Sequence, residues 1–134
     1  MSESILPLIN NLNGPFWKAA EEQRLELPFC IATGQSFWPP SLFSPFVTGG
    51  TVAWRSVAPA GKLLARAVYR RSFLKAFESL MPYGIGLVEL DAGPRLQAFI
   101  AEPDSADAPQ PGQRVGLEFR KLMSEASILT AKSA

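Results

Sequence analysis

The chain contains one cysteine, Cys30, and no histidine, which limits the chemistry that its side chains can perform. Histidine is the most frequent general base and metal ligand, so a Ser-His-Asp or Cys-His site within this chain is excluded. A single cysteine also excludes an intrachain disulfide and cannot form a metal site alone. Any catalysis would have to use carboxylates, lysine, arginine, tyrosine, Cys30 or a group from another subunit.

Glu89 and Asp91 are the carboxylates best spaced for acid–base catalysis, because alternate residues of a strand point to the same face. Asp91, however, opens the sequence Asp-Ala-Gly-Pro, which is typical of a turn stabilised by an aspartate side chain. Glu89 fits equally well as a solvated strand residue. We therefore favour structural roles for both carboxylates and expect no enzyme activity from the chain on its own.

A block of positive charge lies in the middle of a chain whose formal net charge is only +1. No aspartate or glutamate occurs between Leu27 and Phe77, and the cations of this segment are Arg55, Lys62, Arg66, Arg70, Arg71 and Lys75. Such a block suggests an anionic partner, which can be a phosphate-bearing ligand, an acidic protein surface or nucleic acid. The alternative is an exposed strand whose cations pair with acids elsewhere in the fold.

The composition indicates a folded protein of about one domain. Apolar residues make up 47% of the 134 residues and charged residues 19%, which is enough for a hydrophobic core. No apolar run approaches the roughly 20 residues that a membrane helix needs, and residues 1–14 lack the features of a signal peptide. These observations favour a cytoplasmic protein.

The elements that must position these side chains are mostly strands. Asn13-Gly14-Pro15 predicts the start of a helix that runs to about Arg24. Alternating apolar residues predict strands at 51–58, 61–71, 85–90, 95–101 and 114–123; residues 126–130 are a candidate last strand, and a helical stripe predicts a helix at 72–81. In the strand at 61–71 the alternation predicts one face with Lys62, Arg66 and Arg70 and the other with Leu63, Ala65, Ala67 and Tyr69. The fold class is mainly β, and a short antiparallel unit of this kind suits a five-stranded OB-fold barrel.

The order of these features resembles the zinc-ribbon OB-fold proteins catalogued as domain of unknown function thirty-five. "GPFWKAAEEQRLELPFC" is similar to the family's N-terminal helix and entry strand, "PYGIGLVELDAGPRLQAFI" to its hairpin and "PGQRVGLEF" to its penultimate strand. The resemblance runs from about Gly14 to Ile128. It implies an N-terminal helical segment at 1–26, a rubredoxin-like zinc-ribbon knuckle at 27–49 and an OB-fold domain at 50–134.

The knuckle departs from the family pattern, in which C-x-x-C-G is followed by Pro-Pro and C-P-x-C-G. The resemblance places the four former metal-ligand positions at Cys30, Thr33, Ser44 and Val47. Three of four thiolates are therefore replaced, and structural zinc needs four good nitrogen or sulfur donors. We expect a degenerate ribbon without zinc, Cys30 as a buried thiol, and a cluster of aromatic rings in place of the metal: Phe29, Phe37, Trp38, Phe43 and Phe46.

The resemblance implies an accessory subunit of acyl-CoA enzymes. Family members pair with thiolase-like proteins, including lipid-transfer-type thiolases, and with lyases or hydratases of CoA-ester metabolism. We expect a non-catalytic subunit that binds acyl-CoA, a thiolase-like partner or both, in acyl condensation or in lipid or steroid side-chain breakdown. The knuckle aromatics are the candidate docking residues: Phe37, Trp38, Phe43 and Phe46.

The basic block then has a candidate ligand in the phosphates of coenzyme A, which arginine binds in a bidentate manner. The candidate residues are Arg66, Arg70, Arg71 and Lys75. An acidic partner surface is the rival ligand, and neither assignment comes from matched family positions. The sequence leaves self-association open.

An OB-fold module for single-stranded nucleic acid is the alternative function, with the same cations and with Trp54 and Tyr69 as stacking residues. Against it, the aromatic residues gather in the knuckle and are not interleaved along the basic strands.

Overall fold

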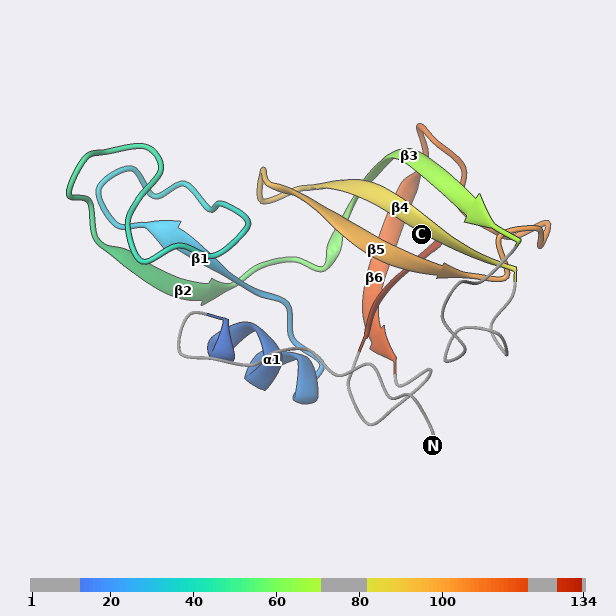
Figure 1. The fold of residues 1–134 in the computed structure, drawn as a ribbon, viewed down its shortest axis with the longest axis horizontal. Helices are drawn as coiled ribbons and strands as arrows, with labels where there is room; N and C mark the ends of the chain where they lie inside the picture. The colour runs from blue at the N-terminus through green and yellow to red at the C-terminus, as the bar shows by residue number, and fades with distance from the viewer. Residues whose placement is uncertain (1–12, 71–81, 121–127, 134) are drawn as a thin grey trace.

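The computed structural model describes residues 13–70, 82–120 and 128–133, which form a helix, a two-stranded sheet and a five-stranded closed barrel. Helix α1 (Gly14–Glu21) lies beside the sheet of β1 (Glu26–Cys30) and β2 (Val52–Ser56), and these elements lie at one end of the barrel (Figure 1). The barrel strands are β3 (Ala60–Tyr69), β4 (Tyr83–Leu90), β5 (Arg95–Ala101), β6 (Arg114–Arg120) and β7 (Ile128–Ser133).

Helix α1 buries one of its faces in the protein. Pro15 stands in the first turn, where its missing N–H costs no hydrogen bond, and Phe16 and Ala20 are buried. The helix ends at Glu21, earlier than expected, because Gln23 adopts a positive φ of 62° and the Arg24 N–H bonds back to the carbonyl of Ala19. This turn directs the chain into β1.

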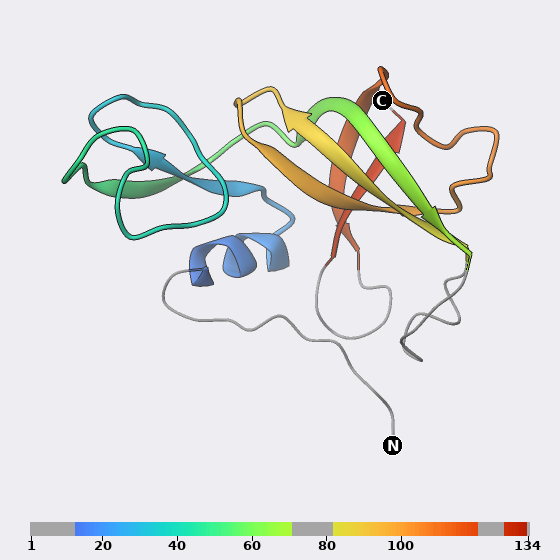
Figure 2. The same ribbon diagram turned by 45° about the horizontal axis from the view of Figure 1, so that its top comes forward.

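The strand predicted at 51–58 forms as β2, but it pairs with β1 and not with the barrel. The antiparallel register places Leu27 opposite Arg55 and Cys30 opposite Val52. The long loop between β1 and β2, residues 31–51, folds back over this sheet and forms the knuckle (Figure 2). The fifth barrel strand is instead β7, at the segment that the sequence left as a candidate.

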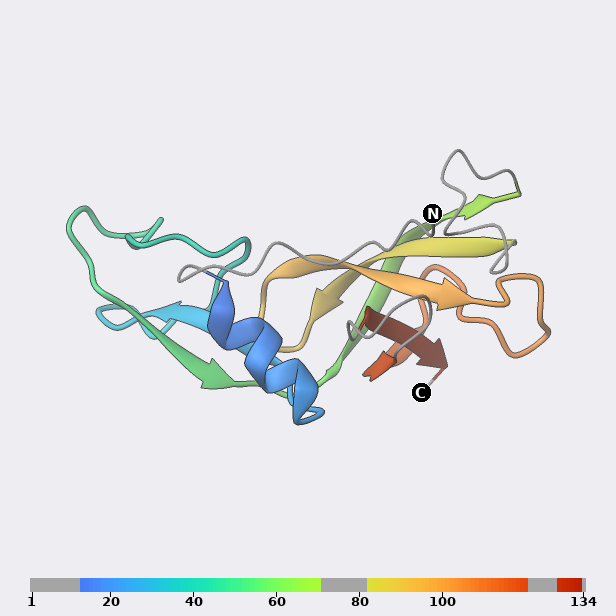
Figure 3. The same cartoon turned by 60° about the horizontal axis from the view of Figure 1, so that its bottom comes forward.

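The barrel confirms the predicted OB-type fold class. Its strand order is β3-β4-β5-β7-β6, closed by antiparallel pairing of β3 with β6, and β5 meets β7 in parallel at Phe99 and Thr130. Figure 3 shows α1 lying alongside the two-stranded sheet at one end of the barrel. One core cluster joins the two parts, because Phe16, Leu25 and Leu27 pack with barrel residues such as Leu63 and Ile100. The knuckle is therefore built on the same core as the barrel.

The predicted faces of the strand at 61–71 are wrong beyond Leu63. The register between β3 and β4 shifts between Leu63 and Ala65, which places a β-bulge at Leu64. A bulge inserts one residue and reverses the alternation after it. Leu63 is accordingly buried, whereas Ala65, Ala67 and Tyr69 are exposed. Lys62 and Arg66, on opposite sides of the bulge, do not belong to one regular cationic row.

The helix predicted at 72–81 lies outside the described residues, and so do Arg71 and Lys75. In the part of the chain that the structure describes, no helix has the length and apolar character needed to cross a membrane.

Candidate functional site

The knuckle brings two of the other former metal-ligand positions, Thr33 and Ser44, to the buried thiol of Cys30. Cys30 is fully buried at the end of β1, and the hydroxyl groups of Ser44 and Thr33 lie within hydrogen-bonding reach of its sulfur. These two contacts, Ser44 first and Thr33 second, favour the thiolate and lower the pKa of Cys30 from 9.0 to about 7. The sequence correctly predicts a buried thiol, but it does not predict this hydroxyl environment.

Ser44 organises the second half of the knuckle. Its Oγ accepts hydrogen bonds from the backbone N–H groups of Phe46 and Val47, at 3.0 and 3.2 Å. Its own N–H bonds to the carbonyl of Gly50. A Cβ at position 50 would lie 2.9 Å from the Cβ of Ser44, so glycine is required where the two segments meet. Backbone hydrogen bonds to Ser44 thus close the loop at this position.

The donor set at these positions does not fit structural zinc. One thiol, two hydroxyl groups and the aliphatic Val47 replace the four thiolates of the family pattern. No group of three histidine, cysteine or carboxylate side chains suited to a metal ion occurs within residues 13–70, 82–120 and 128–133. The side chains at the four former ligand positions therefore do not form a structural zinc site.

Replacement of Ser44 by alanine is expected to raise the pKa of Cys30 toward 9.0, because it removes the largest cause of the lowered value. A thiol whose pKa is lower in the folded than in the unfolded state stabilises the fold fully above about pH 9 and not at all below about pH 7. The wild-type free energy of unfolding should therefore rise between these pH values, and this rise should flatten in Ser44→Ala. Urea denaturation across the range measures both.

Ser41→Ala is the matched control, because the Ser41 hydroxyl also accepts a backbone N–H bond within the knuckle, from Phe43, and is not among the groups that lower the Cys30 pKa. The control should keep the wild-type pH dependence. An identical pH dependence in both variants would contradict the assigned role of Ser44.

Arg55 fastens the knuckle to β2, a role that the sequence analysis did not identify. One guanidinium nitrogen donates to the carbonyl of Gly34 at 2.5 Å and to Oγ of Ser36 at 3.1 Å. The guanidinium carbon stands 4.4 Å from the centre of the Phe29 ring, in a cation–π contact. This cation of the basic block is therefore committed to internal bonds. The sequence could not reveal this role, because it depends on the pairing of β2 with β1.

The outer surface of the knuckle presents most of the exposed large apolar side chains of the described residues. They are Ile31, Leu42, Phe43, Phe46 and Val47; Tyr69 of the barrel is the other. Leu42 and Phe43 are the most exposed, at 72% and 69%. The stretch from Leu27 to Trp54 contains no charged residue. We call these five knuckle residues the apolar patch, and exposed large apolar side chains in a segment without charge are typical of a protein contact surface.

Two of the four predicted docking aromatics do not belong to this patch. Phe37 is buried and meets Phe46 edge to face, with ring centroids 6.2 Å apart. Trp38 is partly buried and packs against Phe16 at 4.8 Å. Phe43 and Phe46 are exposed as the docking prediction requires. The exposed aliphatic residues Ile31, Leu42 and Val47 were missed, because single aliphatic residues in an irregular loop carry no periodic signal.

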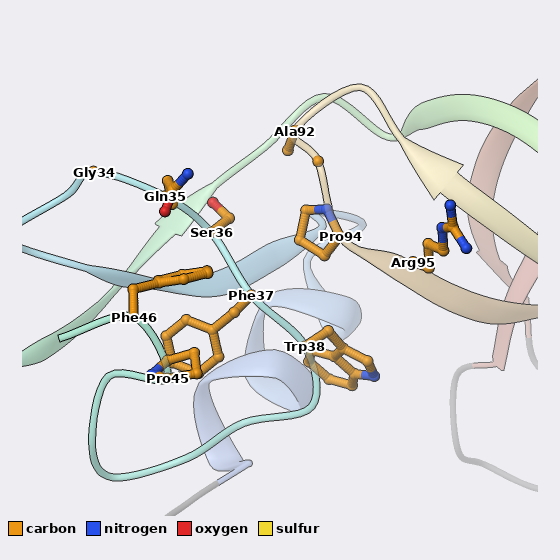
Figure 4. Close-up of a pocket in the computed structure, with 11 residues that line it drawn as sticks. Gly34, Gln35, Ser36, Phe37, Trp38, Pro45, Phe46, Ala92, Pro94 and Arg95 are labelled. Carbon is orange, nitrogen blue, oxygen red and sulfur yellow. The ribbon is translucent and has the colours of Figure 1, made fainter. Parts of the chain in front are cut away.

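A cavity of about 710 Å³ lies between the knuckle and the turn of the β4–β5 hairpin. One wall is the segment 34–38 with Pro45 and Phe46, and the other is the turn at 92–95 (Figure 4). Phe37, Phe46 and Pro45 lie together on the knuckle side, and Pro94 faces them from the hairpin. Arg95 lies at the barrel end of this cavity and pairs with Glu89 at 3.4 Å.

A second, apolar groove of about 360 Å³ lies between α1 and the barrel. Trp38 lines both this groove and the cavity between the knuckle and the β4–β5 turn. The remaining lining residues are Phe16, Trp17, Ile85, Leu96, Gln97, Ala98, Phe99, Ile128 and Leu129. Gln97 supplies the only polar side chain among them. The groove can therefore hold an apolar group, and Trp17 and Trp38 provide rigid aromatic walls.

Of the cations proposed for phosphate binding, the two that the structure describes, Arg66 and Arg70, have partners on the loop between β5 and β6. Arg66 donates to the carbonyls of Pro103 and Pro109, at 3.0 and 3.2 Å. Arg70 forms a bidentate pair with Asp104, at 2.7 and 2.8 Å, which lowers the pKa of that carboxyl group. For Arg70 the structure thus shows the pairing with an acid that the sequence left as the alternative, whereas Arg66 bonds to backbone carbonyls; phosphate binding stays a prediction.

The two candidate catalytic carboxylates are each paired with an arginine. Asp91 accepts two hydrogen bonds from Arg114, at 2.5 and 2.7 Å, and this contact lowers its pKa. Glu89 pairs with Arg95. A general acid needs a raised pKa, and the Arg114 contact stabilises the charged form of Asp91 instead. Both residues fit the structural roles that the sequence favoured.

A closed five-stranded barrel preceded by a helix and a two-stranded knuckle defines an OB-fold protein with a ribbon-like N-terminal extension. Residues 54–120 match the family model described as ChsH2, C-terminal OB-fold domain. The chain belongs to this family, and the resemblance to domain of unknown function thirty-five is confirmed.

The whole fold is similar to a solved chain of the complex described as "Ltp2-ChsH2(DUF35) aldolase". The TM-score is 0.80 and the sequence identity 27%, over 96% of this chain and 98% of that chain. The likeness therefore includes the helix and the knuckle as well as the barrel. A comparison with curated proteins gives no match.

Proposed function

We propose that the chain is a non-catalytic accessory subunit that docks a thiolase-like partner in an aldolase-type complex acting on acyl-CoA esters. The observation that carries the proposal is the apolar patch on the knuckle, which is large, uncharged and exposed. The similar chain of known structure comes from a complex of Ltp2 with ChsH2(DUF35), which supports a partner of the Ltp2 kind. Breakdown of a lipid or steroid side chain is the reaction class that we propose for the complex.

The partner supplies the catalytic groups in this proposal. The chain has no histidine, its cysteine is buried, and its two best-spaced carboxylates are paired with arginines. Cys30 and its hydroxyl neighbours maintain the shape of the knuckle without zinc. The contribution of the chain is then to position the partner and to border its acyl-CoA site.

Contact with the phosphates of coenzyme A would use the end of β3. Arg70 would exchange Asp104 for the ligand, and the exposed position of this ion pair makes the exchange inexpensive. Arg66 is half-buried and bonds two carbonyl groups, so its first role is to hold the loop. The apolar groove beside Trp17 and Trp38 is the surface we propose to border the acyl group.

The docking role is tested by co-purification of the tagged chain with an Ltp2-type thiolase-like protein, and by calorimetry of the pair. Leu42→Asp or Phe43→Asp should weaken binding by at least about tenfold, because each places a charge in the middle of an apolar interface. Neither side chain is buried, so the fold should be unaffected.

Ala58→Asp is the matched control, because it adds the same charge at an exposed position outside the patch. Wild-type affinity in Leu42→Asp and Phe43→Asp would overturn docking through the patch. Failure of the wild-type chain to form any complex would overturn the proposed function itself.

A further inference from the structure

One residue of the knuckle, Ser36, forms an isolated antiparallel bridge at the edge of the β1–β2 sheet. Phe29 and Ser36 are antiparallel partners, and the flanking hydrogen bonds run from the Cys30 N–H to the Gln35 carbonyl and from the Phe37 N–H to the Pro28 carbonyl. The edge segment is thus bound to β1 through Gln35 and Phe37. Ser36 lies between these two bonds.

The backbone groups of Ser36 point away from β1. In an antiparallel pair of this type, the N–H and carbonyl of the middle residue lie on the outer side of the strand. Within the described residues nothing bonds to either group, although Ser36 is only 7% exposed. A donor and an acceptor on one residue of a strand edge are the groups that another strand pairs with.

The cavity of about 710 Å³ adjoins this edge. Its knuckle wall is the segment 34–38 itself, and the turn at 92–95 closes the opposite side. A strand added at this edge would lie about 4.8 Å from it, on the side of the cavity. Phe37, Phe46 and Pro94 line the same space and can receive apolar side chains of such a segment (Figure 4).

We propose that an extended, apolar segment of the thiolase-like partner enters this cavity and pairs with Ser36 as an added strand. The inference rests on the proposed function, because the partner is the protein docked on the apolar patch. Phe46 belongs both to that patch and to the cavity wall, so one partner can cover the two surfaces continuously.

The test compares Ser36→Pro with Ser36→Ala in complexes with the same Ltp2-type thiolase-like protein. Both variants lose the hydroxyl group that bonds to Arg55, but only proline removes the N–H that faces the cavity. That N–H makes no internal bond, so proline is tolerated at this edge position. Ser36→Pro should bind at least about tenfold more weakly than Ser36→Ala, while the two have similar melting temperatures.

Hydrogen exchange of the Ser36 amide in the wild-type chain gives a readout that does not depend on a variant. The amide should exchange quickly in the free chain and slowly in the complex, because the added strand supplies its acceptor. Equal affinity of Ser36→Pro and Ser36→Ala together with an unprotected Ser36 amide would overturn the added strand and leave the docking role intact. If the wild-type chain forms no complex, both proposals fall.

Discussion

Gly61→Ala is expected to destabilise the barrel by about 3 kcal/mol or more, a large part of the total stability of a domain of this size. Gly61 and its neighbour Lys62 are the residues at which β3 pairs with both β4 and β6 and thereby closes the barrel. A Cβ here would collide with the carbonyl of Glu89 and would lie 3.0 Å from the Cα of Leu90. These obstacles are backbone atoms, so no side-chain rotation relieves the overlap.

Urea denaturation followed by circular dichroism measures this loss, with Gly14→Ala as the control. A Cβ at Gly14 meets nothing within 4 Å, and alanine is the better helix former by about 1 kcal/mol. The control should therefore be as stable as the wild type or slightly more stable. A Gly61→Ala variant of wild-type stability would show that the β3–β4 approach is wider than described here.

Leu63→Ala is expected to lower the free energy of unfolding by about 2–5 kcal/mol, because Leu63 is fully buried in the barrel core. Gly86→Ala should also destabilise, by about 1–3 kcal/mol, since its added Cβ would lie 2.6 Å from Cδ1 of Leu63. The two changes act on the same volume. The double variant Leu63→Ala/Gly86→Ala should therefore lose less stability than the sum of the single losses.

A double-mutant cycle by urea denaturation gives the coupling between the two positions. Gly84→Ala combined with Leu63→Ala is the control cycle, because a Cβ at Gly84 meets Ile100 and Ala67 and not Leu63. Strict additivity in the Leu63/Gly86 cycle would mean that these side chains do not share the packing described for β3 and β4.

The fold was accessible from the sequence where local patterns agree with the global structure. The hairpin of β4 and β5 was found because two apolar runs flank the turn at Asp91, and the resemblance placed the knuckle around Cys30. The sequence could not predict which strand pairs with β2, because a short alternating strand fits equally well in a barrel or in a separate sheet. The bulge at Leu64 was missed because one inserted residue leaves no mark in the apolar pattern, although it reverses every side chain that follows.

The candidate site was predictable in its location but not in its contacts. The sequence places the aromatics of the knuckle near Cys30, but burial decides that Phe43 faces outward and Phe37 inward. The internal bonds of Arg66 and Arg70 depend on a loop more than 30 residues away in the chain. Such pairings arise from tertiary contacts, which a basic block in the sequence cannot distinguish from a ligand site.

The absence of charge between Leu27 and Trp54 also bears on how quickly a complex would form. Oppositely charged surfaces attract at a distance and accelerate diffusional encounter, whereas an uncharged face gives no such guidance. Association through the knuckle would then proceed at the unassisted rate of about 10⁵–10⁶ M⁻¹s⁻¹ and change little with ionic strength. The lifetime of the complex, more than the rate of encounter, would determine how much partner the chain retains.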